Sequence, residues 1–141
     1  MRNVNTISSM IEYAMSFLGV PYKWGGANPV EGVDCGGFLQ CVLASVWLDP
    51  PGDQTAQALH DHFENNSLKI KGAGAIVFYG KSSKQITHVA LMINDSQIIE
   101  AGGGGSKTLT REDAAKQSAY VRIRPFGQRN DIVAVLMPSY P

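Results

Sequence analysis

Cysteine is scarce in this chain, which has two among 141 residues. Cys35 and Cys41 stand six residues apart, in a segment predicted below to be one helix, and this spacing is poorly suited to a disulfide. No other feature of the sequence indicates a disulfide-linked scaffold. We therefore expect both thiols to be reduced.

The chain also has a formal net charge of zero and lacks long apolar runs. The 12 basic and 12 acidic side chains cancel, so no overall field favours nucleic acid. No apolar run approaches the roughly 18 residues of a membrane span. Residues 1–15 lack the basic segment, apolar core and small-residue cleavage site that follow one another in a signal peptide. We expect no nucleic-acid partner, no membrane insertion and synthesis in the cytoplasm. The length and the 44% hydrophobic content suit a single domain over residues 1–141.

The order of hydrophobic periods predicts an α+β fold. Apolar residues repeat at helical spacing in 6–18, with Asn5 or Thr6 as cap, in 34–47, whose apolar stripe runs to Trp47, and in 54–64. Later the period changes to two, which indicates about five strands, at 74–79, 87–94, 97–101, 119–124 and 131–137. A capping box of Thr110 and Asp113 predicts a short helix at 111–117. Helices followed by strands favour N-terminal helices packed on an antiparallel sheet.

A glycine-rich segment leads to Cys35 at the start of the second helix. Asp34 can cap that helix, and the positive end of the helix dipole then favours a Cys35 thiolate, although the adjacent carboxylate opposes it. Cys41 lies in the apolar stripe and reads as a packing residue. Gly36 and Gly37 cost the helix about 1 kcal/mol each relative to alanine. We therefore expect another segment to approach their backbone closely.

The candidate partner of Cys35 is a strand histidine. Alternation puts His88 on the opposite face from Thr87. A three-residue hairpin loop over 93–95 would pair His88 directly with Glu100. The carboxylate would then fix the tautomer of the imidazole and stabilise its cation, while the other ring nitrogen takes the thiol proton. Cys35, His88 and Glu100 would act as nucleophile, base and orienting group.

The sequence does not predict a metal or a cofactor. His60 and His62 are two apart on a predicted helix and point to different faces, unlike the i, i+4 pair of a zinc site. The four glycines at 102–105 are not followed by the lysine, serine or helix start of a phosphate-binding loop. We expect them to form a flexible loop at the rim of the site.

Five motifs occur in a fixed order within residues 12–101, the first of them beginning at Pro21: PYKWGG, DCGGF, GAIVFY, THVALMI and IIEA. This series resembles the pattern of the NlpC/P60 family of cell-wall cysteine peptidases. The resemblance implies a papain-like core, in which the cysteine helix packs on the sheet that carries the histidine. It also implies hydrolysis of peptidoglycan stem peptides, typically between D-γ-glutamate and the diamino acid.

The resemblance assigns roles to individual positions. Cys35 matches the nucleophile, His88 the base, and Glu100 the polar third residue. Tyr22 matches a tyrosine that helps to hold the substrate or the oxyanion, with the Cys35 amide as the other donor. Trp24 is expected to pack beside the cleft rather than to donate. The loop that carries Tyr22 and the glycine loop should flank the cleft.

Three positions depart from the family pattern. Gly36 stands where serine is usual, which removes a hydroxyl and is expected to open space beside the nucleophile. Ala75 stands where an aspartate is expected, so a structural hydrogen bond is lost there. Glu100 replaces the common histidine, and its negative charge should hold His88 more strongly as imidazolium.

The biological setting is open at this point. The chain resembles stand-alone, phage-associated members, which implies phage tail proteins as partners and action from the virion or a lysis system at the bacterial cell wall. A cytoplasmic enzyme that recycles free muropeptides fits the same sequence. Two other classes also remain: a papain-like amidase or acyltransferase on another amide, and a non-catalytic structural tail module.

Overall fold

The computed structural model describes residues 3–141. A five-stranded antiparallel sheet has the order β6-β5-β4-β3-β7. Its strands are β3 (Ile76–Gly80), β4 (Ile86–Met92), β5 (Gln97–Gly102), β6 (Tyr120–Pro125) and β7 (Ile132–Leu136). Each predicted strand is present within two residues of its expected bounds, which confirms the α+β prediction.

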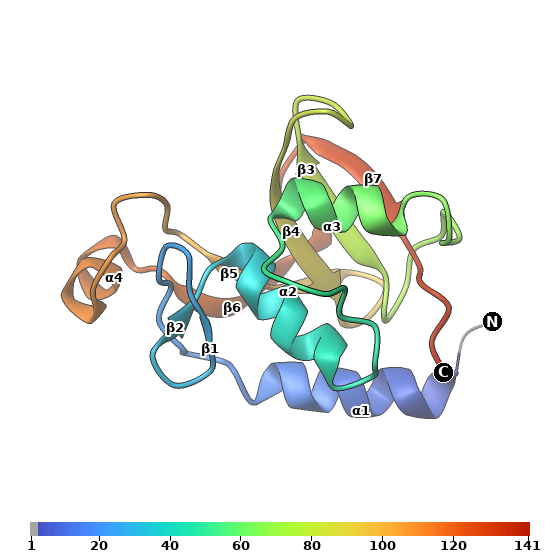
Figure 1. Ribbon diagram of the computed structural model, residues 1–141, viewed down its shortest axis with the longest axis horizontal. Coiled ribbons are helices and arrows are strands. Elements are labelled where there is room, and N and C mark those ends of the chain that lie inside the picture. Colours follow the sequence, from blue (N-terminus) through green and yellow to red (C-terminus); the bar gives the residue numbers. More distant parts are fainter. Residues whose placement is uncertain (1–2) are drawn as a thin grey trace.

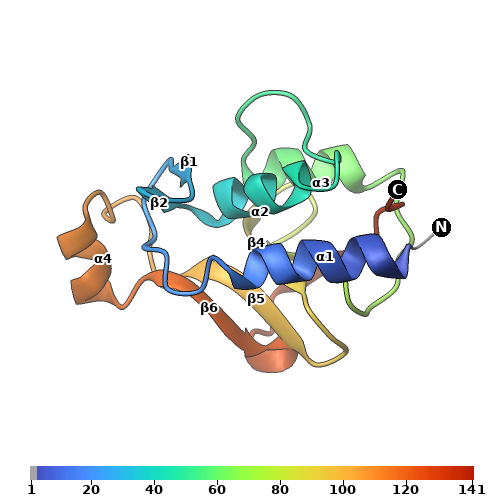
Figure 2. The same cartoon turned by 90° about the horizontal axis from the view of Figure 1, so that it is seen from below.

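Three helices from the N-terminal half pack beside one another and against the sheet. They are α1 (Val4–Met15), α2 (Cys35–Ala44) and α3 (Ala56–Phe63). In Figure 1 α2 crosses in front of β4 and β5, with α1 below it and α3 above it, and Figure 2 shows α1 and α2 side by side. Between residues 3 and 141 no helix is both long and apolar enough to cross a membrane.

The smaller elements gather at the end of the molecule beyond the start of α2. They are the hairpin of β1 (Ala27–Asn28) and β2 (Gly32–Val33) and the helix α4 (Arg111–Gln117). The short helix η1 (Phe126–Gln128) follows the opposite end of β6, where the amide of Phe126 donates to the carbonyl of Ser96 over 2.8 Å. Figure 1 shows the hairpin and α4 next to each other at the left. Arg111 joins them, because its guanidinium donates to the carbonyl of Val30 over 3.0 Å.

The core lies between α2 and the sheet. Phe38, Leu39, Val42 and Leu43 of α2 are fully buried. They meet the buried side chains of the central strands, among them Val89 and other members of β4. This apolar layer fixes α2, and with it Cys35, against the strands that carry the polar residues of the site.

The ends of the first three helices differ from the predicted ranges: α1 begins two residues earlier and ends three earlier, α2 ends three earlier, and α3 is shorter by two residues at its start and one at its end. Asn3, rather than Asn5 or Thr6, caps α1, since its side-chain oxygen accepts from the amides of both those residues at 3.1 and 3.2 Å. The helix α2 ends at Ala44, and the turn that closes it puts Trp47 at φ +65°. Trp47 is 90% exposed, so its predicted place in the core stripe is wrong.

The capping box of α4 is present as predicted. The Thr110 hydroxyl accepts from the amide of Asp113 at 3.1 Å, and the Asp113 carboxylate accepts from the amide of Thr110 at 3.1 Å. Both bonds satisfy amides that a helix start leaves without acceptors. The helix spans the seven residues expected from the sequence.

Candidate active site

Cys35 is the first residue of α2, and Asp34 is its cap. One carboxylate oxygen of Asp34 accepts from the amide of Gly37 at 2.7 Å, and the other accepts from the amide of Gly25 at 3.1 Å. The same carboxylate therefore begins the helix and holds the preceding loop against it. Burial raises the pKa of Asp34, although these two amides act in the opposite direction.

The two glycines after Cys35 are required by close neighbours. A Cβ on Gly37 would collide with the carbonyl oxygen of Gly26, and a Cβ on Gly36 would lie 2.8 Å from the carbonyl oxygen of Gln54. The expected close approach is confirmed. The expected open space beside the nucleophile is not, because the backbone that leads into α3 fills the place of the missing side chain.

His88 and Glu100 meet across the sheet, but their register differs from the predicted one. The His88 Nε2 and Glu100 Oε1 atoms are 2.7 Å apart, and Glu100 is 2% exposed. Met92 pairs with Ile98, so the hairpin loop covers 94–96, one residue later than expected. The predicted direct pairing is therefore wrong. Each β4 residue that pairs with β5 does so two positions later than predicted. Because a shift of two preserves the alternation of side chains, Glu100 stays on the same face of the sheet as His88.

A bulge in β4 aims two consecutive side chains at the site. Tyr79 pairs with His88 and Gly80 pairs with Ile86, so Thr87 is the extra residue on β4. Thr87 lines the same cavity as His88. Simple alternation put these two residues on opposite faces, and for Thr87 that prediction is wrong.

Arg122 is the third charged or polar side chain in contact with the others, beside His88 and Glu100, and the sequence alone did not predict its role. In the β5–β6 register Arg122 stands directly opposite Glu100. Its Nε donates to Glu100 Oε2 at 3.1 Å, so the carboxylate lies between His88 and the guanidinium. The signal in the sequence was an arginine within a predicted strand, but its partner depends on the pairing of β5 with β6.

The electrostatics of the group favour a protonated His88. Burial favours its neutral form, but the hydrogen bonds to Cys35 and Glu100 outweigh burial and raise the pKa of His88 to about 9. Burial acts to raise the pKa of Glu100 as well, yet hydrogen bonds and charge attraction from His88 and Arg122 lower it. Because Nε2 of His88 is engaged by Glu100, Nδ1 is the ring nitrogen left for the thiol of Cys35.

Two cavities meet at Cys35. The first has a volume of about 440 Å³ and the second of about 310 Å³. Cys35, Tyr22 and Thr87 line both of them. The first cavity, which we call the arginine arm, is further lined by His88, Glu100, Ala101, Gly102, Gly103, Gly104, Arg122, Arg124, Gln128 and Arg129. The second, the aspartate arm, is further lined by Trp24, Gly25, Asp34, Gly36, Asp53, Gln54, Thr55, Ala56, Gln57 and Ile86.

The predicted flanking residues lie where expected, with one correction. Tyr22 is 6% exposed, and burial together with the nearby Cys35 and Asp34 raises the pKa of its hydroxyl. That hydroxyl therefore stays protonated and can donate. Trp24 lines the aspartate arm but is 52% exposed rather than packed. The glycine loop follows Glu100 at the rim, as predicted.

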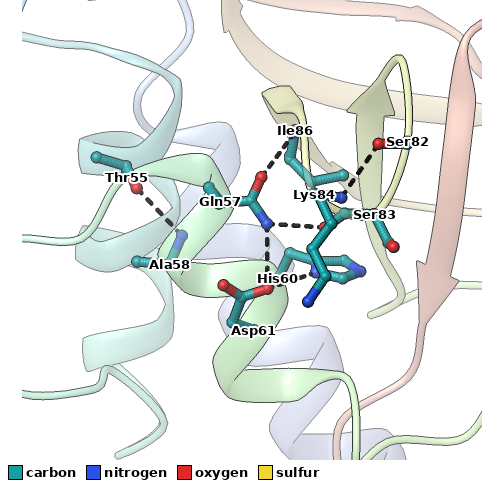
Figure 3. A network of polar contacts seen from close by, with 9 residues as sticks. All are labelled: Thr55, Gln57, Ala58, His60, Asp61, Ser82, Ser83, Lys84 and Ile86. Carbon is teal, nitrogen blue, oxygen red and sulfur yellow. Dashed lines mark hydrogen bonds and ion pairs between the residues drawn. The ribbon is translucent and has the colours of Figure 1, made fainter.

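The start of β4 is held by a polar network from α3, shown in Figure 3. Gln57 accepts from the amide of Ile86 at 2.8 Å and donates to the carbonyl of Ser83 at 2.8 Å and to Asp61 at 3.1 Å. Asp61 also contacts the ring of His60 at 3.0 Å. These contacts fix the strand immediately before its bulge and so fix the direction in which the bulged residues point.

The comparisons with known proteins agree with this geometry. The model of the NlpC/P60 family matches residues 19–124. The chain belongs to the NlpC/P60 family. Its cysteine helix, packed on a sheet that presents the histidine, is the papain-like arrangement of that family's domains.

Two relatives and one solved structure illustrate the likeness. The bifunctional muramidase/DL-endopeptidase CwlT of Bacillus subtilis is 33% identical over 99 residues, which cover 69% of this chain and 30% of CwlT. The peptidoglycan endopeptidase RipB of Mycobacterium tuberculosis is 32% identical over 116 residues, covering 72% of this chain and 45% of RipB. This chain thus spans less than half the length of either relative. An NLP/P60 family protein similar to a lipoprotein, from Staphylococcus aureus Mu50, superposes with a TM-score of 0.74 at 20% identity, covering 99% of this chain and 43% of that one.

Proposed function

We propose that this chain is a cysteine endopeptidase that cleaves peptidoglycan stem peptides, with Cys35 as nucleophile and His88 as base. One observation carries the proposal. The imidazole of His88 is held by Glu100 through one nitrogen and lines the same cavity as the thiol of Cys35, at the junction of two open cavities. A nucleophile, a base and an orienting group in contact are the minimum for covalent acyl transfer.

The first chemical step follows from these contacts. With His88 as imidazolium, Cys35 attacks as the thiolate, and its sulfur forms a bond to the carbonyl carbon of the scissile amide. The carbonyl electron pair moves to oxygen. The amide of Cys35, which has no acceptor within the first turn of its helix, and the Tyr22 hydroxyl are the donors that stabilise this oxyanion.

The second half of the reaction returns the enzyme to its starting state. As the carbon–nitrogen bond breaks, His88 gives its proton to the leaving amine, and a thioester to Cys35 remains. His88, now neutral, takes a proton from water, and the resulting hydroxide attacks the thioester. The carboxylic acid leaves, and Cys35 and His88 regain their thiolate and imidazolium pair. Glu100 keeps the imidazole in one orientation throughout.

The substrate class is supported by the relatives. CwlT is named as a DL-endopeptidase and RipB as a peptidoglycan endopeptidase. Together with the motif resemblance, these names favour the bond between D-γ-glutamate and the diamino acid. Two arms that meet at the nucleophile suit a peptide that extends to both sides of the scissile bond.

Digestion of purified sacculi followed by mass spectrometry tests the proposal. We expect new fragments that end in D-γ-glutamate and fragments that begin with a free diamino acid amine, and neither should form with the Cys35→Ala variant. Sacculi that stay intact beside thiol-dependent turnover of another amide would instead indicate an amidase or acyltransferase. Absence of turnover on both would indicate a module without catalysis.

The biological setting is a separate proposal. The motif resemblance to stand-alone, phage-associated members supports a virion-borne or lytic component that meets phage tail proteins and acts at the bacterial cell wall. An antibody against the chain, applied to purified virions and to cytoplasmic fractions of the producing cells, tests it. Detection in the virion supports the tail role, whereas detection only in the cytoplasm of uninfected cells supports muropeptide recycling.

A further inference from the structure

The arginine arm is strongly cationic next to the nucleophile. Arg122, Arg124 and Arg129 line it, and the acidic residue among its lining is Glu100. That carboxylate is already engaged by His88 and Arg122. The arm therefore keeps an excess of positive charge beside the reacting atoms.

The three arginines differ in what holds them. Arg122 donates to Glu100, and Arg129 forms a two-point ion pair with Asp131, at 2.8 and 2.6 Å, while lying over the ring of Tyr79. For Arg124, residues 3–141 provide no hydrogen bond or ion pair, and its side chain is partly exposed in the cavity. Its five N–H donors are thus available to a ligand.

The position of Arg124 follows from the strand. Arg122 and Arg124 are two residues apart on β6, so both side chains lie on the face of the sheet that carries Glu100. The pairing of β6 with β5 fixes their backbone. Arg124 is therefore presented by a rigid element rather than by a loop.

The opposite arm has the opposite charge. Asp34 and Asp53 line the aspartate arm, whose lining contains neither arginine nor lysine. Cys35 and Tyr22 lie where the arms meet. A peptide bound across Cys35 consequently meets a cationic environment on one side of the nucleophile only. The site can therefore distinguish peptides by their charge and by the direction in which the peptide chain is bound.

We propose that Arg124 binds a free carboxylate that flanks the scissile amide, and that the site selects stem peptides carrying this carboxylate over those in which it is a carboxamide. This inference rests on the proposed function for its substrate. A guanidinium fits a carboxylate with two parallel hydrogen bonds. A carboxamide has no charge, and its NH₂ group would face a side chain that can only donate.

Binding measurements on the Cys35→Ala protein test the inference apart from turnover. The probes are γ-D-glutamyl-diaminopimelate and analogues in which one carboxylate at a time is a carboxamide, titrated by calorimetry. We expect one analogue to bind about 10- to 100-fold more weakly than the parent, the range for a charge-assisted hydrogen bond. Adding Arg124→Gln should reduce that difference to less than about threefold, mainly by weakening the parent.

Matched variants make the result specific. Arg124→Lys keeps the charge but loses the two-point geometry, so it should retain part of the preference. Lys116→Gln removes one positive charge from exposed α4 and should retain all of it. A thermal melt of each variant shows whether it is folded.

The outcomes separate the two proposals. Equal binding of every analogue, or a preference that survives Arg124→Gln in a folded protein, overturns the role of Arg124. Failure of the unmutated protein to cleave any of the peptides or sacculi counts against the proposed function and leaves the binding result to decide on Arg124. Cleavage without discrimination supports the proposed function and overturns the inference.

Discussion

At the scale of single residues, the chain of contacts from Cys35 through His88 and Glu100 to Arg122 controls where the proton resides. Neighbouring members act on one another: His88 and the Arg122 guanidinium hold Glu100 ionised, and Cys35 and Glu100 hold His88 protonated. The thiol therefore faces an imidazolium at neutral pH. Loss of any one member should change the charge state of its neighbours and not only remove a contact.

The alkaline limb of the pH–rate profile should report His88. In the unmutated protein we expect kcat/KM to fall above about pH 9, where the imidazolium loses its proton. Glu100→Gln removes the anionic partner, so the limb should move down by about one to two pH units. Glu112→Gln, an exposed substitution on α4, should leave the limb in place. A limb that stays near pH 9 in Glu100→Gln would contradict the orienting role of Glu100.

The two cysteines should differ in reactivity. Burial and the nearby Asp49 raise the pKa of Cys41, whose thiol also lies 3.5 Å from the carbonyl of Ala27. Cys35 faces the imidazolium and lines two open cavities. Iodoacetamide at pH 6, followed by peptide mapping, should label Cys35 first, and His88→Ala should remove much of that advantage. Equal labelling of both thiols in the folded protein would argue against the ion pair.

These residues also show how far the sequence could predict the site. Cys35, Asp34 and the capping contact could be predicted because helix-start chemistry is local. His88 and Glu100 could be placed on one face because a hairpin loop limits the register. Arg122 could not be predicted, since its contact depends on where β6 joins the sheet after an intervening helix.

At the scale of elements, the site depends on how closely α2 and the chain before α3 approach each other. The Gln54 carbonyl lies where a side chain on Gly36 would project. Gln54 in turn donates its amide to the side chain of Gln40 on α2 at 2.8 Å, which ties the two segments together. Gly36 and Gln54, which both line the aspartate arm, are therefore held together by close contact of their backbones. Neither segment can move away without breaking this packing.

Gly36→Ala should destabilise the protein even though alanine favours helices. The helix propensity gain is about 1 kcal/mol, but the new Cβ would have to displace a backbone oxygen, and overpacking of this kind costs about 1 to 3 kcal/mol. Urea unfolding should show a lower midpoint and a matched loss of activity as the Gln54 segment shifts. Gly127→Ala, where a Cβ meets no atom within 4 Å, is the control and should be close to neutral. A more stable Gly36→Ala protein would show that the segment moves freely.

The elements show which signals in the sequence were sufficient. The capping box gave α4 its correct bounds because both of its hydrogen bonds form within four residues. The hydrophobic stripe extended α2 too far, because Leu48 donates its amide to the carbonyl of Leu43 and closes the helix before Trp47. Alternation failed at Thr87, since a bulge depends on how β3 and β4 pair and not on either strand alone.

At the scale of the whole molecule, the site lies between two layers. Cys35 comes from the helical layer, whereas His88, Glu100 and Arg122 come from three neighbouring strands of the sheet. The apolar core around α2 packs the helical layer on the sheet. Global unfolding separates the thiol from the imidazole, so the proton affinity of His88 must contribute to the pH dependence of folding stability.

The direction of that contribution follows from the shift. The folded protein raises the pKa of His88 from 6.5 to about 9, so protonation stabilises the fold fully below about pH 6.5, and this stabilisation is lost as the pH rises through about 9. Its size is roughly 3 kcal/mol at 1.36 kcal/mol per unit. Urea unfolding between pH 6 and 10 should show this decline in the unmutated protein and in His62→Gln, whose side chain is exposed on α3. The decline should be largely absent in His88→Gln, and three parallel curves would mean that His88 gains no proton affinity on folding.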